Sequence, residues 1–381
     1  MKQTKVVVSI DSFKGSLSSL QAGNAVKEAV LKLNPDALVV VKPLADGGEG
    51  TVDALSRAAG AKCVEIPVTG PLQRKVSAKY CILADGNTAV IEMAAAAGIT
   101  LISAEERNPL ETTTYGVGEI IKDAISRGCR RFIIGIGGSA TNDGGVGMLT
   151  ALGFAFSDSS GNPIAPGAKG LRDLTKISTE NVLPQLAECS FRIACDVSNP
   201  LCGPQGCSAV YGPQKGATPA MVADMDRWLA HYGELAESIS PQANMCHPGA
   251  GAAGGLGFAF LSFTNAELKP GIEIVLEETA LEQDIIDADI VVTGEGRLDS
   301  QTVMGKAPIG VARLAKKHGK KVVAFSGCVT QDAEVCNLHG IDAFFPILRE
   351  VTTLEAALDT ETAYTNLQKT AYQVFRLLFD V

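Results

Sequence analysis

The stretch KVVVSIDSFKGSLSSLQAGNAVKEAVLKLNPDALVVVKPL, residues 5–44, decides the fold class. It opens with a continuous run of apolar, mostly β-branched residues at 5–10, which is typical of a strand buried on both faces. Apolar residues then recur at helical spacing until Pro35 ends the helix, and a second apolar run follows at 37–44. A strand–helix–strand unit of this kind predicts a parallel sheet with a right-handed crossover.

The same pattern returns near the C-terminus. Residues 288–294 and 320–327 read as buried strands, and a helix at 307–319 separates them. Another strand is expected at 342–348, and a long amphipathic helix at 354–379 closes the chain. We therefore predict one Rossmann-like parallel sheet that is built from both chain ends.

The middle of the chain has a different pattern. Residues 75–95 alternate in polarity, pause at a DGN turn and resume, which favours an antiparallel hairpin. We therefore predict an α/β protein with two α/β domains and the active site in the cleft between them. A Rossmann-like domain would comprise residues 1–68 and 286–381, and a mixed-sheet domain at 69–285 would be inserted into it.

Composition excludes several classes of protein. The 381 residues carry a formal net charge of −9 and only 5% aromatic residues, so we expect no nucleic-acid partner. The N-terminus lacks a signal-peptide pattern, and the apolar stretch at 248–263 is too short and glycine-rich for a membrane span. We expect a cytoplasmic protein without membrane contact, whose ten cysteines are reduced.

Five glycine-rich polar loops follow apolar runs. In parallel α/β sheets, loops at the carboxyl ends of strands converge on the ligand. Any one of these loops is as readily a plain surface turn, but five together favour a functional site. The loops span residues 11–16, 45–51, 137–145, 195–201 and 293–302.

The residue types in these loops suit phosphoryl transfer. The backbone N–H groups of Gly137, Gly138 and Ser139 are predicted to form an anion-binding turn, with a helix starting near Gly144. Carboxylates without a positive neighbour suit Mg²⁺ bound to phosphate oxygens, and nearby cations supply counter-charge. The carboxylates are Asp46, Asp143, Asp196 and Asp299, and the cations are Lys14, Lys215, Arg297 and Lys306.

Two other functions remain open at this point. Gly135, Gly137 and Ala140 fit GxGxxA after a strand, and Asp158 stands where a ribose-binding acid would, so the alternative is an NAD(P)-dependent dehydrogenase of a small hydroxy acid. An observation against the dehydrogenase is that the fingerprint requires a helix directly after its second glycine, whereas here the SATNDGG segment delays the helix. The third reading is a non-catalytic binding protein. No Walker A or protein-kinase signature occurs.

Long segments of the chain resemble the bacterial glycerate kinase family of glyoxylate and sugar-acid catabolism. They include DSFKGSLSSLQAGNAV, PLADGGEGTVDAL, RNPLETTTYGVGEII, GIGGSATNDGGVGML, GAGAAGGLG and TGEGRLDSQTVMGKAPIGVA, in the family's order through residue 312. Cys202 and Cys207 depart from the family's usual small residues. The resemblance implies ATP-dependent phosphorylation of D-glycerate, aided by a divalent cation such as Mg²⁺, with 2-phosphoglycerate favoured over 3-phosphoglycerate. A homodimer is compatible with it.

Side-chain roles follow from the chemistry of transferring a phosphoryl group to a hydroxy acid. Lys14 and Arg297 are expected to clamp anionic groups. Asp196 would orient or deprotonate the attacking hydroxyl, and Lys215 would neutralise charge on the phosphoryl group. Asp46 and Asp299 are the candidate metal ligands. The remaining candidates for substrate or phosphate binding are Ser12, Gly137, Gly138, Ser139, Asn142, Asn199, Glu295 and Lys306.

Overall fold

The structure is a computed structural model, and it describes residues 3–45, 55 and 60–379. Among these, residues 3–45, 55 and 272–379 form one compact unit, and residues 60–271 form another. These units place the boundaries nearer 60 and 272 than the predicted 69 and 286. Each unit carries its own sheet, and the expected α/β class, with one parallel and one mixed sheet, is confirmed.

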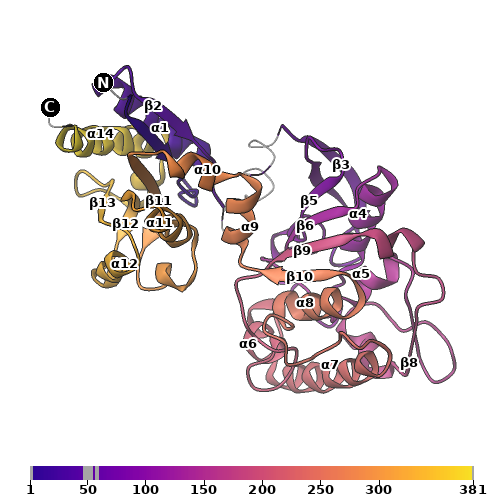
Figure 1. Ribbon diagram of the computed structural model, residues 1–381. Helices are drawn as coiled ribbons and strands as arrows, with labels where there is room; N and C mark the ends of the chain where they lie inside the picture. The colour runs from indigo at the N-terminus through magenta and orange to yellow at the C-terminus, as the bar shows by residue number, and fades with distance from the viewer. Residues whose placement is uncertain (1–2, 46–54, 56–59, 380–381) are drawn as a thin grey trace. The chain divides into compact units, whose positions relative to one another are not determined.

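The first unit contains a five-stranded parallel sheet in the order β13-β12-β11-β1-β2. Both chain ends contribute strands, as predicted, and Figure 1 shows α14 beside α1 in this unit. The strands are β1 (Lys5–Val8), β2 (Leu38–Val41), β11 (Ile290–Leu298), β12 (Lys321–Val329) and β13 (Ala343–Pro346).

Helix α1 shows how local sequence fixes an element in this unit. It spans Ser19–Leu33 and begins there because Ser18 and Gln21 form a capping box. Its apolar stripe, which includes Val26 and Val30, is buried in the core of the unit. The other helices are α9 (Gly271–Glu278), α10 (Leu281–Ile286), α11 (Ala307–Lys317), α12 (Val335–Leu338), α13 (Leu354–Leu358) and α14 (Thr360–Leu378).

The second unit contains a six-stranded mixed sheet in the order β10-β9-β6-β5-β4-β3. Only β4 runs against the other five strands, so β3, β5, β6, β9 and β10 end at the same edge. These strands are β3 (Lys62–Thr69), β4 (Lys75–Ile82), β5 (Thr88–Glu92), β6 (Arg131–Gly135), β9 (Ser190–Ala194) and β10 (Ala266–Lys269).

Aromatic packing and helices cover this second sheet. Phe132 and Phe191 on neighbouring strands stack with ring centroids 4.8 Å apart, and Phe260 of α8 packs on Phe191 at 5.6 Å. The helices are α3 (Ala94–Ala97), α4 (Tyr115–Ser126), α5 (Val146–Ala151), α6 (Cys207–Tyr211), α7 (Pro219–Ile239) and α8 (Ala252–Phe263), and a separate hairpin joins β7 (Ala155–Ser157) to β8 (Lys176–Ser178).

The predicted hairpin at 75–95 is present as β4 and β5, but β3 was not anticipated. The register of β3 on β4 places Cys63 directly opposite Cys81, and the two form a disulfide. The expectation that all ten cysteines are reduced is therefore wrong for this pair, because an unrecognised strand brings them together. Among the described residues, no helix has both the length and the apolarity needed to cross a bilayer.

Candidate active site

The loop that follows β6, residues 136–145, presents backbone N–H groups at the strand-end edge of the second sheet. Gly138 has a φ of 72°, and the segment is tied down by Ile99 N–H to Gly138 O and Ala140 N–H to Ala97 O, both at 2.9 Å. Gly137 and Gly138 are exposed, and no described residue accepts a hydrogen bond from the N–H groups of 137–139. These groups can therefore bind an anion.

A second glycine-rich segment supports this loop from behind. The N–H of Gly144 donates to the carbonyl of Gly254 at 2.9 Å. A Cβ at Gly254, whose φ is 69°, would lie 2.0 Å from the carbonyl oxygen of Thr141, so only glycine allows this approach. The expected helix near Gly144 begins at Val146, two residues later, because Gly145 is left-handed with a φ of 74°.

Asp143 holds the loop together from inside the protein. Its carboxylate accepts the N–H and Oγ1–H of Thr114 at 2.8 and 2.9 Å, the N–H of Gly145 at 3.1 Å, the N–H of Gly147 at 3.3 Å and the hydroxyl of Thr113 at 3.4 Å. Burial raises the pKa of Asp143, and the hydrogen bonds from Thr114 and Gly145 oppose that shift. Asp143 is thus a structural acceptor whose bonds fix the course of the loop.

Lys215 lies beneath the same loop and is 2% exposed. Its Nζ donates to Ser139 Oγ and to the carbonyl of Thr141, both at 2.7 Å. Burial lowers the pKa of Lys215 to about 8. The structure therefore brings two of the predicted site residues, Ser139 and Lys215, into direct contact beside the exposed N–H groups of Gly137 and Gly138.

The loop after β9 carries the next two candidates. Asp196 is exposed, and its Oδ1 accepts the N–H of Gly271 at 3.1 Å. Asn199 donates from Nδ2 to the carbonyl of Gln205 at 2.8 Å and accepts the Tyr211 hydroxyl at 2.6 Å. Because β6 and β9 are adjacent parallel strands, this loop and the 136–145 loop leave the sheet at neighbouring positions.

Asn142 has a different environment from the one expected. Its side chain is fully buried, and its Nδ2 donates to Ser208 Oγ at 2.8 Å. Its part in substrate or phosphate binding stays a prediction.

The first unit carries a separate cluster of charged candidates at the ends of β1 and β11. These two strands are neighbours at the point where the order of the sheet reverses, which is where open α/β sheets bind ligands. The backbone N–H of Asp11 donates to the carbonyl of Gly294 at 2.9 Å, and Ser12 N–H donates to Asp11 Oδ1 at 2.7 Å. A Cβ on Gly296 would lie 3.4 Å from the backbone N of Lys14, so the 11–16 loop lies against β11.

Alternating charges line the end of β11. Arg297 Nε lies 3.2 Å from Asp299 Oδ2, and Lys306 Nζ lies 3.7 Å from Asp299 Oδ1 and 4.0 Å from Glu295 Oε2. Glu295 is 9% exposed and accepts the Thr302 hydroxyl at 2.8 Å. The structure therefore brings four predicted residues together here: Glu295, Arg297, Asp299 and Lys306.

The carboxylates of Glu295 and Asp299 are a donor set that suits Mg²⁺, which binds one or two carboxylates together with substrate phosphates. Within the described part of the chain, no group of three or more His, Cys, Asp or Glu side chains forms a ready-made metal cage. A magnesium ion usually keeps several water ligands beside one or two carboxylates and phosphate oxygens. The other metal candidate, Asp46, lies outside the described residues.

Comparison of the chain with known proteins identifies one family. The family model described as "Glycerate kinase family" matches residues 6–379. The chain belongs to the glycerate kinase family. It is 48% identical to a glycerate kinase of Haemophilus influenzae, with 98% of each chain covered, and 48% identical to a glycerate 2-kinase of Escherichia coli, with 95% of each covered. The predicted resemblance is thereby confirmed.

A solved structure also supports membership of the glycerate kinase family. The crystal structure of a protein designated glycerate kinase 2 from Salmonella typhimurium is 44% identical and superposes with a TM-score of 0.92, covering 100% of this chain and 99% of that one. The chain is therefore an enzyme of the phosphotransferase class with an alcohol acceptor, as expected from the resemblance.

The structure does not have the strand–loop–helix geometry that a dinucleotide-binding dehydrogenase requires at residues 135–140. Helix α5 starts only at Val146, so it does not begin directly after the second glycine of the fingerprint. Asp158 lies in a turn, where it accepts the N–H groups of Ser160 and Asn162 at 2.9 Å each. Strand β7 before it pairs with β8 and not with β6, so Asp158 is not placed to bind a ribose.

Thr113 and Thr114 support the site by donating hydrogen bonds to Asp143, and the sequence analysis did not identify them. They lie some thirty positions before Asp143 in the chain, and only the folded structure shows that they share its carboxylate. The available signal was a run of three threonines at 112–114, which lies directly before helix α4.

Replacing Asp143 with alanine should destabilise the protein. We expect Asp143→Ala to lower the free energy of unfolding by about 3 kcal/mol, because buried N–H and O–H donors lose their acceptor. Urea unfolding measures the change. Asp158→Ala, in an exposed turn, is the matched control and should cost about 1 kcal/mol or less. Equal losses for the two variants would show that Asp143 does not organise the loop.

Proposed function

We propose that this protein transfers the γ-phosphoryl group of ATP directly, in line, to a hydroxyl of D-glycerate. The product is phosphoglycerate, with 2-phosphoglycerate favoured over 3-phosphoglycerate. The observation that carries the proposal is the 48% identity to a glycerate 2-kinase over 95% of both chains. The exposed amides of the 136–145 loop beside a buried lysine are the anion-binding chemistry that such a reaction needs. We expect the reaction to take place in the cytoplasm, where ATP is supplied.

The second unit supplies groups that bind and activate. The N–H groups of Gly137–Ser139 hold phosphate oxygens, and Lys215, fixed by its bonds to Ser139 and Thr141, neutralises charge on the transferred group. Asp196 accepts the proton of the attacking hydroxyl or orients that hydroxyl, because it is the exposed carboxylate that follows β9. Asn199 keeps the same loop in place.

The first unit supplies the remaining charges. Lys14 and Arg297 bind anionic groups, and the planar guanidinium of Arg297 can hold a carboxylate through two parallel bonds. Glu295 and Asp299 would hold Mg²⁺, with Asp46 as a further candidate, and Lys306 and Ser12 complete the phosphate contacts. A bound Mg²⁺ would shield the charge of the phosphate oxygens during transfer.

One assay separates this function from its alternatives. Purified protein with ATP, Mg²⁺ and D-glycerate should form ADP, and omission of glycerate should abolish ADP formation. NMR of the product should show phosphorus coupled to the proton on C2. Coupling to the C3 protons would assign the other isomer. A dehydrogenase would change NAD(P)H absorbance without ATP, and a binding protein would retain glycerate without turnover; either result would overturn the proposal.

A further inference from the structure

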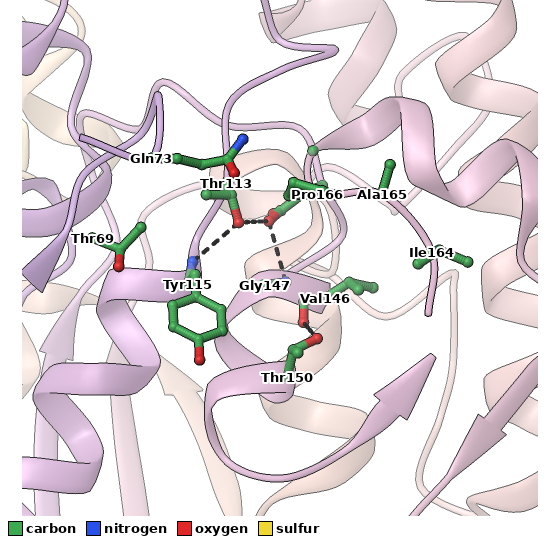
Figure 2. Close-up of a pocket in the computed structure, with 12 residues that line it drawn as sticks. Thr69, Gln73, Thr113, Tyr115, Val146, Gly147, Thr150, Ile164, Ala165 and Pro166 are labelled. Atoms are coloured by element: carbon green, nitrogen blue, oxygen red, sulfur yellow. Dashed lines mark hydrogen bonds between the residues drawn. The ribbon is translucent and has the colours of Figure 1, made fainter. Parts of the chain in front are cut away.

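A pocket of about 380 Å³ lies entirely within the second unit, beside the end of β3 (Figure 2). Thr69, the last residue of β3, forms part of its wall, and Val146 and Thr150 of α5 form another part. Asp143 of the 136–145 loop also lines the pocket, and α5 directly follows that loop in the chain. Ligands of parallel α/β sheets bind outside the carboxyl ends of the strands.

The lining of the pocket suits an uncharged, partly aromatic group. Val146, Ile164 and Pro166 supply apolar surface, and Tyr115, whose ring is drawn in Figure 2, is 36% exposed. Of the described residues that line the pocket, none is lysine, arginine or histidine. These lining residues carry no positive charge to neutralise a phosphate or a carboxylate. An aromatic face beside apolar surface suits a flat heterocycle instead.

Polar groups around the pocket can fix the orientation of such a ligand. The hydroxyl of Thr150 donates to Val146 O at 2.8 Å, which leaves its oxygen able to accept a further bond. Gln73 is exposed and carries an amide that can donate and accept. Among the lining residues that the structure describes, Asp143 is the one carboxylate, and it already accepts bonds from Thr114 and Gly147, so it acts as a fixed part of the wall.

Asp143 also connects the pocket to the anion-binding loop. Its carboxylate binds Thr113 and Gly147 on the pocket side and Gly145 at the end of the loop. A ligand that fills the pocket and extends over the loop would therefore meet one continuous, hydrogen-bonded support. A nucleotide has this form, because an uncharged nucleoside carries a chain of anionic phosphates.

We propose that this pocket holds the adenosine part of ATP, with the adenine base against the ring of Tyr115 and the phosphates extending toward Gly137–Ser139. The inference rests on the proposed function, since it assigns the ATP of that reaction to the second unit. Glycerate then takes its carboxylate contacts outside this pocket. Tyr115 is accordingly a specificity-determining residue for the nucleoside.

The test compares nucleotide fragments on two variants of Tyr115. Tyr115→Ala should weaken ADP and adenosine binding about tenfold, because base stacking on an aromatic ring contributes on this order. Tyr115→Phe, which keeps the ring, should bind both ligands like the unaltered protein. Inorganic tripolyphosphate should bind all three proteins equally. Calorimetric titration measures each affinity, and the unfolding midpoint confirms that the variants are folded.

A second variant keeps the test independent of any change at Tyr115. Ala165 lines the pocket and is exposed, so Ala165→Trp should fill the cavity and block adenosine while tripolyphosphate still binds. Unchanged ADP affinity in both Tyr115→Ala and Ala165→Trp would overturn the assignment. These titrations measure binding and do not require the enzyme to turn over. If the kinase assay fails but both variants bind ADP more weakly, the pocket assignment stands and the proposed reaction is wrong. If the enzyme is active but both variants bind ADP with unaltered affinity, the proposed reaction stands and the pocket assignment is wrong.

Discussion

Lys215→Met should lower kcat about 10²–10³-fold while leaving the protein folded, because removing one preorganised group that stabilises transition-state charge has an effect of this size. Methionine keeps most of the volume of the buried stem. It removes the ammonium that contacts Ser139 Oγ and Thr141 O at 2.7 Å. Steady-state kinetics with ATP and D-glycerate measures the loss, and it should appear in kcat more than in the KM for either substrate.

The pH profile gives an independent readout of Lys215. Burial lowers its pKa to about 8, and a lysine carries its charge only below its pKa, so activity should fall as pH rises through about 8. Lys215→Met should lack this alkaline limb. Between about pH 8 and 10.5 the unfolded chain binds this proton and the folded chain does not, so this group makes the protein more stable as pH rises there.

Ser139→Ala is the matched control for the lysine. It removes one acceptor of Lys215 but keeps the charge and the bond to Thr141, so we expect a smaller loss of kcat and an unchanged alkaline limb. Turnover of Lys215→Met within tenfold of the unaltered enzyme, with the alkaline limb retained, would show that the ammonium takes no part in catalysis.

The sequence predicted the first sheet well because parallel strands buried on both faces leave a simple pattern. Val6, Val7 and Val8 are all fully buried, and such continuous apolar runs are easily recognised. Strand β3 left no such pattern. Most of its residues are exposed or half-exposed. It also contains Pro67, and a proline is tolerated on an edge strand but makes a segment of sequence hard to recognise as a strand. The disulfide between Cys63 and Cys81 was missed for the same reason.

The site was predictable as a set of loops but not as a set of side-chain directions. Glu295 and Asp299 are close because one lies on β11 and the other directly follows it. Lys215 lies in a short 3-10 helix after α6, and only the folded chain brings it to Ser139. Whether a side chain in a glycine-rich loop points outward depends on backbone angles that sequence does not give. Asn142 and its neighbours at 139–146 are buried, whereas Gly137 and Gly138 at the start of the loop are exposed.

Asp196→Asn should lower kcat roughly 10²–10⁴-fold with little change in stability, if Asp196 is the group that receives or orients the proton of the attacking hydroxyl. The amide is nearly the same size, and its oxygen can still accept the N–H of Gly271, which the carboxylate binds at 3.1 Å. The substitution therefore removes proton affinity and charge but keeps the loop contact. Single-turnover measurement of ADP formation at saturating ATP and glycerate isolates the chemical step.

The control for this variant is a carboxylate on the same sheet without a proposed part in the chemistry. Glu267 on β10 lies beside Arg192 and Lys269 at 3.5 and 3.1 Å, and Glu267→Gln should leave kcat within about twofold, because it is an exposed ion-pair residue. Near-normal turnover of Asp196→Asn would show that Asp196 neither receives nor orients the proton of the attacking hydroxyl, and the in-line reaction would then proceed without a carboxylate at the end of β9.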